Sequence, residues 1–232
     1  MPRDPRFDIL FEPVKIGPVT APNRFYQVPH CTGMGYQLPA SLATMRGIKA
    51  EGGWGVVNTE YCSIHPSSDD IPAPFASLWD DDDTRNMTAM VEAVHVHGAL
   101  AGVELWHGGL RSSNLQSRET GCGSRRLPVA SDPWQCARMD LEDIRQLRRW
   151  HRDAALRAKA AGMDIVYVYA AHTYLLGQFL DREINQRTDE YGGSFPNRTR
   201  LLRELVAETR EAVGDRCAVA IRIEIDDEQG GG

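Results

Sequence analysis

The segment AGMDIVYVYAAHTY, residues 161–174, contains an apolar run that leads directly into a histidine and two tyrosines. The run from Asp164 to Tyr169 follows Gly162 and is typical of a strand that is buried on both faces. Tyr169, His172 and Tyr174 stand at its carboxyl end. Because barrel enzymes carry their chemistry at the carboxyl ends of their strands, this segment predicts both a parallel sheet and a site.

The same unit of helix, glycine and short apolar strand recurs along the chain. Apolar runs that follow a glycine lie at 56–64, 100–106, 165–169 and 217–225, and an earlier strand is expected at 25–29. Two helices are clearest, at 140–161, with Asp140 as the N-cap, and at 197–213. On the first of them Ile144, Leu147, Ala154, Ala155, Ala158 and Ala161 fall on one face. Five strands that alternate with helices indicate a parallel α/β fold.

Two parallel architectures compete, a (β/α)8 barrel and a doubly wound sheet. A dinucleotide-binding doubly wound sheet calls for G-x-G-x-x-G after a strand, and Gly33-Met34-Gly35 and Gly121-Cys122-Gly123 each lack the third glycine. Polar and aromatic residues instead follow every expected strand, which favours the barrel. Since a barrel has eight strands in about 250 residues, we expect a TIM barrel truncated after about five strands. Residues 1–232 would form the N-terminal portion of one domain.

The composition excludes several classes of function. The net charge is −6, whereas nucleic-acid binders usually present a basic face. Neither a signal peptide nor an apolar run long enough to span a membrane is visible. The five cysteines match no zinc or iron–sulfur spacing, and their odd number fits a reduced protein. We therefore expect a cytoplasmic protein with no metal site, no nucleic-acid partner and no membrane contact.

The residues alone leave two readings open for most candidate site positions. Cys31 is either a small buried thiol at a strand end or a nucleophile at the barrel mouth. Glu104 and Arg222, each inside an apolar strand, are either partners in ion pairs or cofactor ligands. Tyr61 is either a capping aromatic or one wall of a site that recognises a methylated amine through π-faces. Histidine titrates near neutral pH, so His172 beside two tyrosines favours proton chemistry.

Three motifs carry a family resemblance. They are Pro29-His30-Cys31, residues 167–175, and the run RTDEYGGS at 187–194 followed by Asn197-Arg198. Together they resemble the old yellow enzyme family of NADH:flavin oxidoreductases, and within it the trimethylamine dehydrogenase branch. The resemblance extends from Leu10 to Arg222 and implies an FMN-binding TIM barrel.

The resemblance also implies roles for individual residues. Pro29, His30, Cys31, Glu104 and Arg222 would bind FMN, with a covalent link through the Cys31 sulfur. Glu104 would lie at the pyrimidine edge of the flavin, and Arg222 would lie beside its N1/C2=O edge.

The implied substrate and proton-transfer residues lie on the same rim. Tyr61 and His107 would contact substrate, although His107 departs from the tyrosine expected in the trimethylamine branch. Tyr169 and His172 would form a triad with an aspartate further along the chain. Tyr174 matches the proton-donating tyrosine of ene-reductases.

The function so implied is oxidative demethylation of a small N-methylated amine, trimethylamine-like, to the demethylated amine and formaldehyde. Electrons would leave through a [4Fe–4S] cluster, held by residues beyond this chain, to an electron-transfer flavoprotein. The full-length protein would be a homo-oligomer. The alternatives are a dehydrogenase for dimethylamine, histamine or an N-methyl amino acid, an ene-reductase that uses NADPH, and an inactive barrel fragment.

Overall fold

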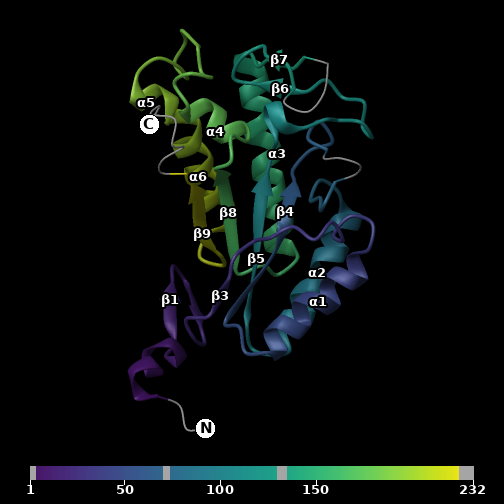
Figure 1. The fold of residues 1–232 in the computed structure, drawn as a ribbon, viewed down its shortest axis with the longest axis vertical. Coiled ribbons are helices and arrows are strands. Elements are labelled where there is room, and N and C mark those ends of the chain that lie inside the picture. The colour runs from purple at the N-terminus through teal and green to yellow at the C-terminus, as the bar shows by residue number, and fades with distance from the viewer. Residues whose placement is uncertain (1–3, 70–73, 130–134, 225–232) are drawn as a thin grey trace.

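The computed structural model describes residues 4–69, 74–129 and 135–224. Its centre is a parallel sheet in the order β3-β4-β5-β8-β9. The strands are β3 (Tyr26–Gln27), β4 (Val56–Ser63), β5 (Leu100–Trp106), β8 (Ile165–Ala170) and β9 (Ala218–Ile223). This sequential order, in a sheet that curls around its inner face, is that of half a barrel (Figure 1). A doubly wound sheet would reverse its order. The predicted truncated TIM barrel is therefore confirmed.

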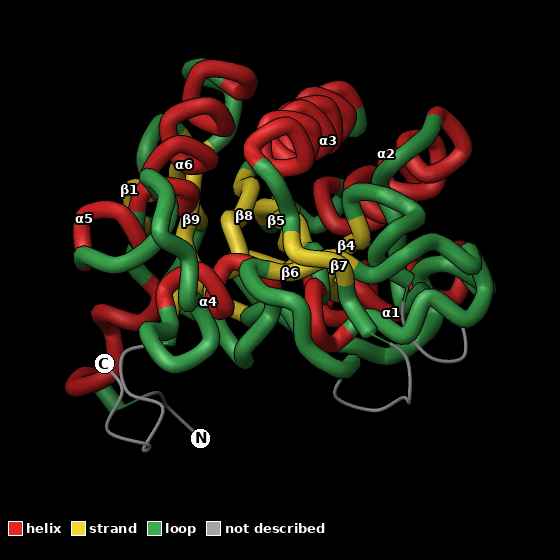
Figure 2. Tube along the Cα trace, turned by 90° about the horizontal axis from the view of Figure 1, so that it is seen from above, coloured by secondary structure: helices red, strands yellow, loops and turns green. Residues whose placement is uncertain are grey.

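The helices that join the strands cover the outer face of the sheet (Figure 2). They are α1 (Pro39–Glu51), α2 (Asp81–His95), α3 (Leu141–Ala160) and α6 (Arg200–Val213). The helix predicted at 140–161 corresponds to α3, and all six residues predicted for its apolar face are buried. Gly53, Gly98, Gly162 and Gly214 have positive φ, as expected of residues that end helices. The expected strand end at Ile225 lies outside the described residues.

Short elements complete the chain. They are η1 (Pro5–Phe11), β1 (Val14–Ile16), β2 (Val19–Ala21), η2 (Gly109–Arg111), β6 (Cys122–Gly123), β7 (Ala137–Arg138), α4 (Leu175–Leu180) and α5 (Phe195–Arg198). The helix predicted from residue 197 begins three residues later, because α5 forms a separate turn before it. No helix in the described ranges is long and apolar enough to cross a membrane.

The inner face of the sheet has an apolar lower part and a polar, aromatic upper part. Val56, Ile165, Tyr167 and Ala218 form the lower cluster, against which the β1–β2 hairpin packs. Successive side chains of a strand alternate between faces, so Glu104, Trp106 and Tyr169 point to the same inner side nearer the carboxyl ends. The hairpin closes one end of the half-barrel, and the site residues gather at the other.

The start of α3 fixes the longest helix behind the site. The Asp140 carboxylate accepts hydrogen bonds from the N–H groups of Glu142 (2.7 Å) and Asp143 (2.9 Å), and Asp143 reciprocates to the Asp140 N–H (2.8 Å). We expect Asp140→Ala to lower the free energy of unfolding by about 1 kcal/mol. Urea unfolding followed by circular dichroism measures it. Asp153→Ala, an exposed substitution within the same helix, is the control. Equal stability of both variants and the parent would contradict this role for the capping box.

Candidate functional site

An aromatic cluster lies at the carboxyl ends of β4, β5 and β8. The Tyr61 ring stacks on Trp106 with centroids 4.4 Å apart and lies 5.5 Å from Phe75. Tyr174 turns its edge to Trp106 and to Tyr169, at 5.2 Å from each. Edge-to-face and offset stacking at these separations are the favoured aromatic geometries. Tyr61, Tyr169 and Tyr174, three residues predicted as site candidates, are thus brought into one wall.

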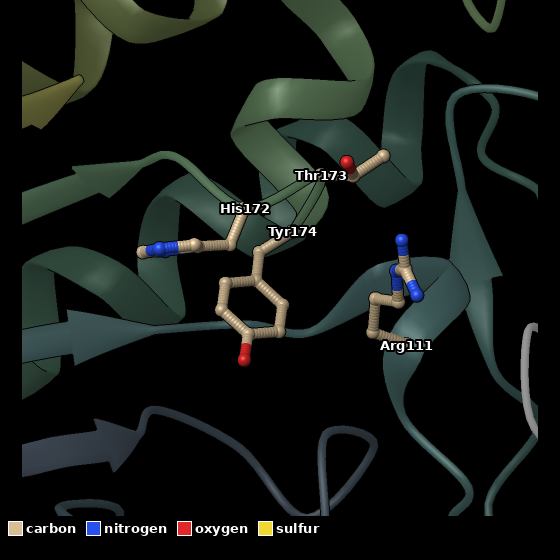
Figure 3. Close-up of a pocket in the computed structure, with 4 residues that line it drawn as sticks. All are labelled: Arg111, His172, Thr173 and Tyr174. Atoms are coloured by element: carbon tan, nitrogen blue, oxygen red, sulfur yellow. The ribbon is translucent and has the colours of Figure 1, made fainter. Parts of the chain in front are cut away.

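Tyr169 and His172 form the shortest polar contact of the cluster, with Tyr169 Oη 2.6 Å from His172 Nδ1. Burial, reinforced by the charge of Glu104, raises the pKa of Tyr169 and keeps it a neutral phenol. His172 and Thr173 both have φ near +57°, a left-handed conformation that is uncommon outside glycine. The His172 N–H donates to the Glu224 carboxylate at 2.7 Å. This strained turn aims His172 and Tyr174, which are two residues apart, in different directions (Figure 3).

Glu104 and Arg222 face each other across β8. Arg222 Nη1 lies 3.3 and 3.4 Å from the two Glu104 oxygens, and its guanidinium lies 4.9 Å from the Tyr169 ring centroid. Burial raises the pKa of Glu104 to about 7, against the opposing attraction of Arg222. A charge-assisted hydrogen bond is normally 2.7–2.9 Å long, so this contact is loose and does not offset the burial. The ion pair, one of the two alternatives that the residues left open, is present, and it leaves further hydrogen-bonding capacity on both side chains.

A pocket of about 420 Å³ opens beside this cluster, lined by Arg111, His172, Thr173 and Tyr174 (Figure 3). Arg111 ends the short η2 turn after β5 and is exposed. Its guanidinium has no hydrogen bond or ion pair among the described residues, so it can pair with an incoming acceptor.

Pro29, His30 and Cys31 follow β3 at the same rim. Pro29 is buried, His30 is half-buried and Cys31 is exposed. The His30 ring lies between Gln27, Arg46 and Lys49, and its pKa is lowered, first by burial and then by the two cations. Cys31 lies close enough to Tyr169 to interact with it electrostatically.

His107 is a predicted site residue whose side chain does not reach the aromatic cluster, and the His30 ring likewise contacts residues of α1 instead. Trp106 points inward, so the next side chain turns away and lies against Ser67 Oγ (3.2 Å) and Cys122 Sγ (3.8 Å). Burial lowers the pKa of His107 to about 3, with a smaller contribution from His65. A neutral, enclosed imidazole behind the sheet cannot line the pocket.

Sequence reasoning missed three residues of this region. Trp106 shares its strand face with Glu104, and period-two alternation alone would have placed it in the cluster. Arg46 lies on the face of α1 formed by Leu42, Ala43 and Ala50 and is fully buried. A cation at an apolar helical position was a visible signal. Nothing in the sequence around Arg111 distinguished it from other surface arginines.

Among the described residues, no group of three His, Cys, Asp or Glu side chains is arranged to hold a metal ion.

Comparisons with known proteins place the chain in a family. A family model described as the NADH:flavin oxidoreductase / NADH oxidase family matches residues 9–232. Dimethylamine dehydrogenase from Hyphomicrobium sp. (strain x) is 47% identical over 233 residues, which cover 97% of this chain and 32% of that protein.

Two solved structures are also closely similar. That of 6-hydroxypseudooxynicotine amine oxidase from Pseudomonas geniculata N1 has a TM-score of 0.95 and 50% identity, over 98% of this chain and 34% of that chain. The structure of histamine dehydrogenase from Rhizobium sp. 4-9 has a TM-score of 0.92 and 48% identity, over 95% of this chain and 34% of that chain. The chain spans about a third of the length of these relatives. They confirm the similarity to amine dehydrogenases that the motifs predicted.

Because the pKa of Glu104 is raised in the folded protein, the free energy of unfolding should depend on pH. Between pH 4.5 and about 7 the folded protein keeps a proton on Glu104 that the unfolded chain has released. Stability therefore falls as pH rises through this window. Glu104→Gln should abolish that dependence, which amounts to at most about 3 kcal/mol. Urea unfolding of both proteins across the window measures the difference. Arg222→Gln should extend this pH window upward, because Arg222 lowers the pKa of Glu104. Parallel dependence of stability on pH in the parent and in Glu104→Gln would refute the raised pKa of Glu104.

Proposed function

The chain belongs to the NADH:flavin oxidoreductase / NADH oxidase family, and from that premise we propose that it is the N-terminal, FMN-binding part of an enzyme that oxidises a small N-methylated amine. The observation that carries this proposal is the aromatic wall of Tyr61, Trp106, Tyr169 and Tyr174. A tertiary amine carries at most one N–H, and only when it is protonated, so a protein recognises its methyl groups and charge mainly through π-faces.

The rim residues fit the flavin that this family uses. The pyrimidine edge of a flavin presents both hydrogen-bond donors and acceptors. Glu104, with a pKa of about 7, can supply either a donor or an acceptor, and Arg222 contacts Glu104 through its Nη1 atom only. We propose that Glu104 and Arg222 hold that edge, that Pro29 and His30 line the ring, and that Cys31 Sγ is the point of covalent attachment. Bound FMN supplies the two-electron acceptor.

Tyr169 and His172 are proposed to manage the substrate proton. An amine must be neutral to give up a hydride from its methyl carbon, yet most small amines are protonated at neutral pH. Because the Tyr169 hydroxyl lies 2.6 Å from His172 Nδ1, it can accept a proton from the ammonium while passing its own to the imidazole. Tyr174, at the edge of the same cluster, completes the wall and helps to exclude water.

Trimethylamine is the substrate type favoured by Tyr61. The similar proteins are named for dimethylamine, histamine and 6-hydroxypseudooxynicotine, so related amines belong to the same proposal. An electron-transfer flavoprotein as acceptor, a [4Fe–4S] cluster outside this chain, a homo-oligomer and a cytoplasmic location complete the proposed function.

Arg111 favours a second candidate substrate, an amine that carries a carboxylate, such as an N-methyl amino acid. Its guanidinium lines the pocket beside Tyr174 and has no partner among the described residues. A guanidinium forms paired, charge-assisted hydrogen bonds with a carboxylate. Arg111 therefore offers a binding group that trimethylamine does not use.

The covalent link is tested by acid precipitation of the full-length protein. Flavin absorbance should remain in the pellet of the parent and should move to the supernatant for Cys31→Ala, because the carbon–sulfur bond is then absent. Cys122→Ala, which changes a cysteine beside His107, should keep its flavin in the pellet. Flavin that stays fixed to Cys31→Ala would overturn the linkage.

The two substrate candidates are separated by Arg111→Met. Loss of a hydrogen bond to a charged group is worth about 1.5–3 kcal/mol. We therefore expect kcat/KM for dimethylglycine to fall about 10- to 100-fold, with kcat/KM for trimethylamine unchanged. Steady-state kinetics with an artificial electron acceptor measure both. Arg125→Met, an exposed arginine outside the pocket lining, is the matched control. Equal effects on both amines would remove Arg111 from substrate recognition.

A further inference from the structure

Two buried charges of opposite sign belong to none of the roles proposed so far. They are Glu60, in the middle of β4, and Arg46, on α1, and both side chains are fully buried. A buried charge is retained only where other groups satisfy it. Their partners identify what each charge does.

Glu60 is satisfied by one short loop. Its two carboxylate oxygens accept hydrogen bonds from four successive backbone N–H groups, those of Thr32 (2.5 Å), Gly33 (2.6 Å), Met34 (3.0 Å) and Gly35 (2.9 Å). The Thr32 hydroxyl adds a fifth at 2.9 Å. Consecutive amides that converge on one anion form a nest, and here the anion is part of the protein.

The loop has little freedom to adopt another shape. Gly33 has a φ of +74°, which favours glycine, and a Cβ on Gly35 would come within 2.6 Å of the Ala76 Cβ. The four amides can therefore point at Glu60 only while residues 32–35 keep this turn.

Arg46 holds the chain on the other side of Cys31. Its Nη2 donates to the His30 carbonyl at 2.8 Å, and its Nη1 lies 3.1 Å from His30 Nδ1 and 3.2 Å from Gln27 Oε1. Burial lowers the pKa of Arg46, and the charge of Glu60 is the largest effect that opposes this. The two charges stabilise each other while each binds a different stretch of backbone.

Cys31 is the residue between these two anchors. His30 is held by Arg46 and Thr32 is held by Glu60, whereas Cys31 itself is exposed at the barrel mouth. We propose that Glu60 and Arg46 are positioning residues for Cys31, which fix the backbone on both sides of it so that Sγ occupies one location on the rim. The inference rests on the proposed role of Cys31 in flavin attachment.

Attachment is a reaction in which such positioning matters. It exchanges the Cys31 S–H bond and one flavin C–H bond for a carbon–sulfur bond, and dioxygen takes up the two electrons and two protons released. A displacement of about 1 Å at a reacting atom can slow a reaction about 100-fold. Glu60 and Arg46 would therefore control the rate of attachment and leave the affinity for FMN largely unchanged.

The test is a time course in the flavin-free, full-length protein after FMN is added. Glu60→Gln keeps the shape of the side chain but turns an NH2 group toward backbone N–H donors, so the loop must move. We expect the rate at which flavin becomes acid-stable to fall about 10- to 100-fold. Total bound FMN, read from absorbance before acid, should stay near the parent value.

Asp69→Asn is the matched control. Asp69 is another buried carboxylate that accepts two backbone N–H bonds, from Gln116 and Ser117, but it anchors a different loop. It should leave the attachment rate unchanged. Thr32→Val removes only one of the five donors to Glu60 and should slow attachment to a smaller degree. This milder variant keeps the test decisive where Glu60→Gln does not fold.

The outcomes separate this inference from the proposed function. A parent protein with no acid-stable flavin would refute the covalent link. The anchoring would then be judged by the rate at which iodoacetamide alkylates Cys31 and by hydrogen exchange at the amides of residues 32–35. Faster exchange and altered alkylation in Glu60→Gln, but not in Asp69→Asn, would support it. Attachment at the parental rate in Glu60→Gln, or parental exchange and alkylation, would overturn it.

Discussion

The parallel pairing of the strands is the constraint on which the site depends. In the register between β5 and β8, Glu104 lies opposite Tyr167, and between β8 and β9 Tyr169 lies opposite Arg222. Parallel strands bring their carboxyl ends to one edge, and alternation along each strand selects which side chains face inward. Five segments far apart in sequence thereby place the aromatic wall, the Glu104–Arg222 pair and Cys31 on a single rim.

Buried charges are handled in two contrasting ways on this rim. Glu60 is satisfied by five donors at short distances, so its role is to hold a loop in place. Among the residues that the structure describes, Glu104 has one loose hydrogen-bonding partner, Arg222, and its pKa rises to about 7. A saturated carboxylate fixes structure, whereas an unsaturated one retains capacity for a ligand. The difference in hydrogen bonding therefore separates positioning from binding among acids of the same type.

The sequence predicted the sheet well because local and global signals agree there. Glycines after helices, apolar strands and the Asp140 cap all point to the same parallel fold, and the strand and helix bounds agree within a few residues. It also brought together Tyr61, Tyr169, His172 and Tyr174, because each stands at a strand end.

Three kinds of position were harder to predict. Side-chain direction at the end of a strand was misjudged for His107, whose neighbour Trp106 takes the inward place. The helical pattern could have shown that Arg46 is buried, but not that its partner is His30, in a loop far away in sequence. Arg111 is placed by an irregular turn after β5. Such positions are set by tertiary packing, which short-range spacing does not encode.

Burial gives this rim an electrostatic preference that suits the proposed chemistry. It raises the pKa of Tyr169 and lowers the pKa of His30, so both stay neutral, and it leaves Glu104 only partly ionised near pH 7. The cations Arg222 and Arg111 are offset by the partly ionised Glu104 and by the Glu224 carboxylate, which accepts a hydrogen bond from the His172 N–H beside the pocket. Aromatic faces attract an ammonium group, so the wall can hold the protonated amine until the proposed transfer of its proton to the Tyr169–His172 pair. The amine is then uncharged, the only form with a lone pair available to support loss of hydride.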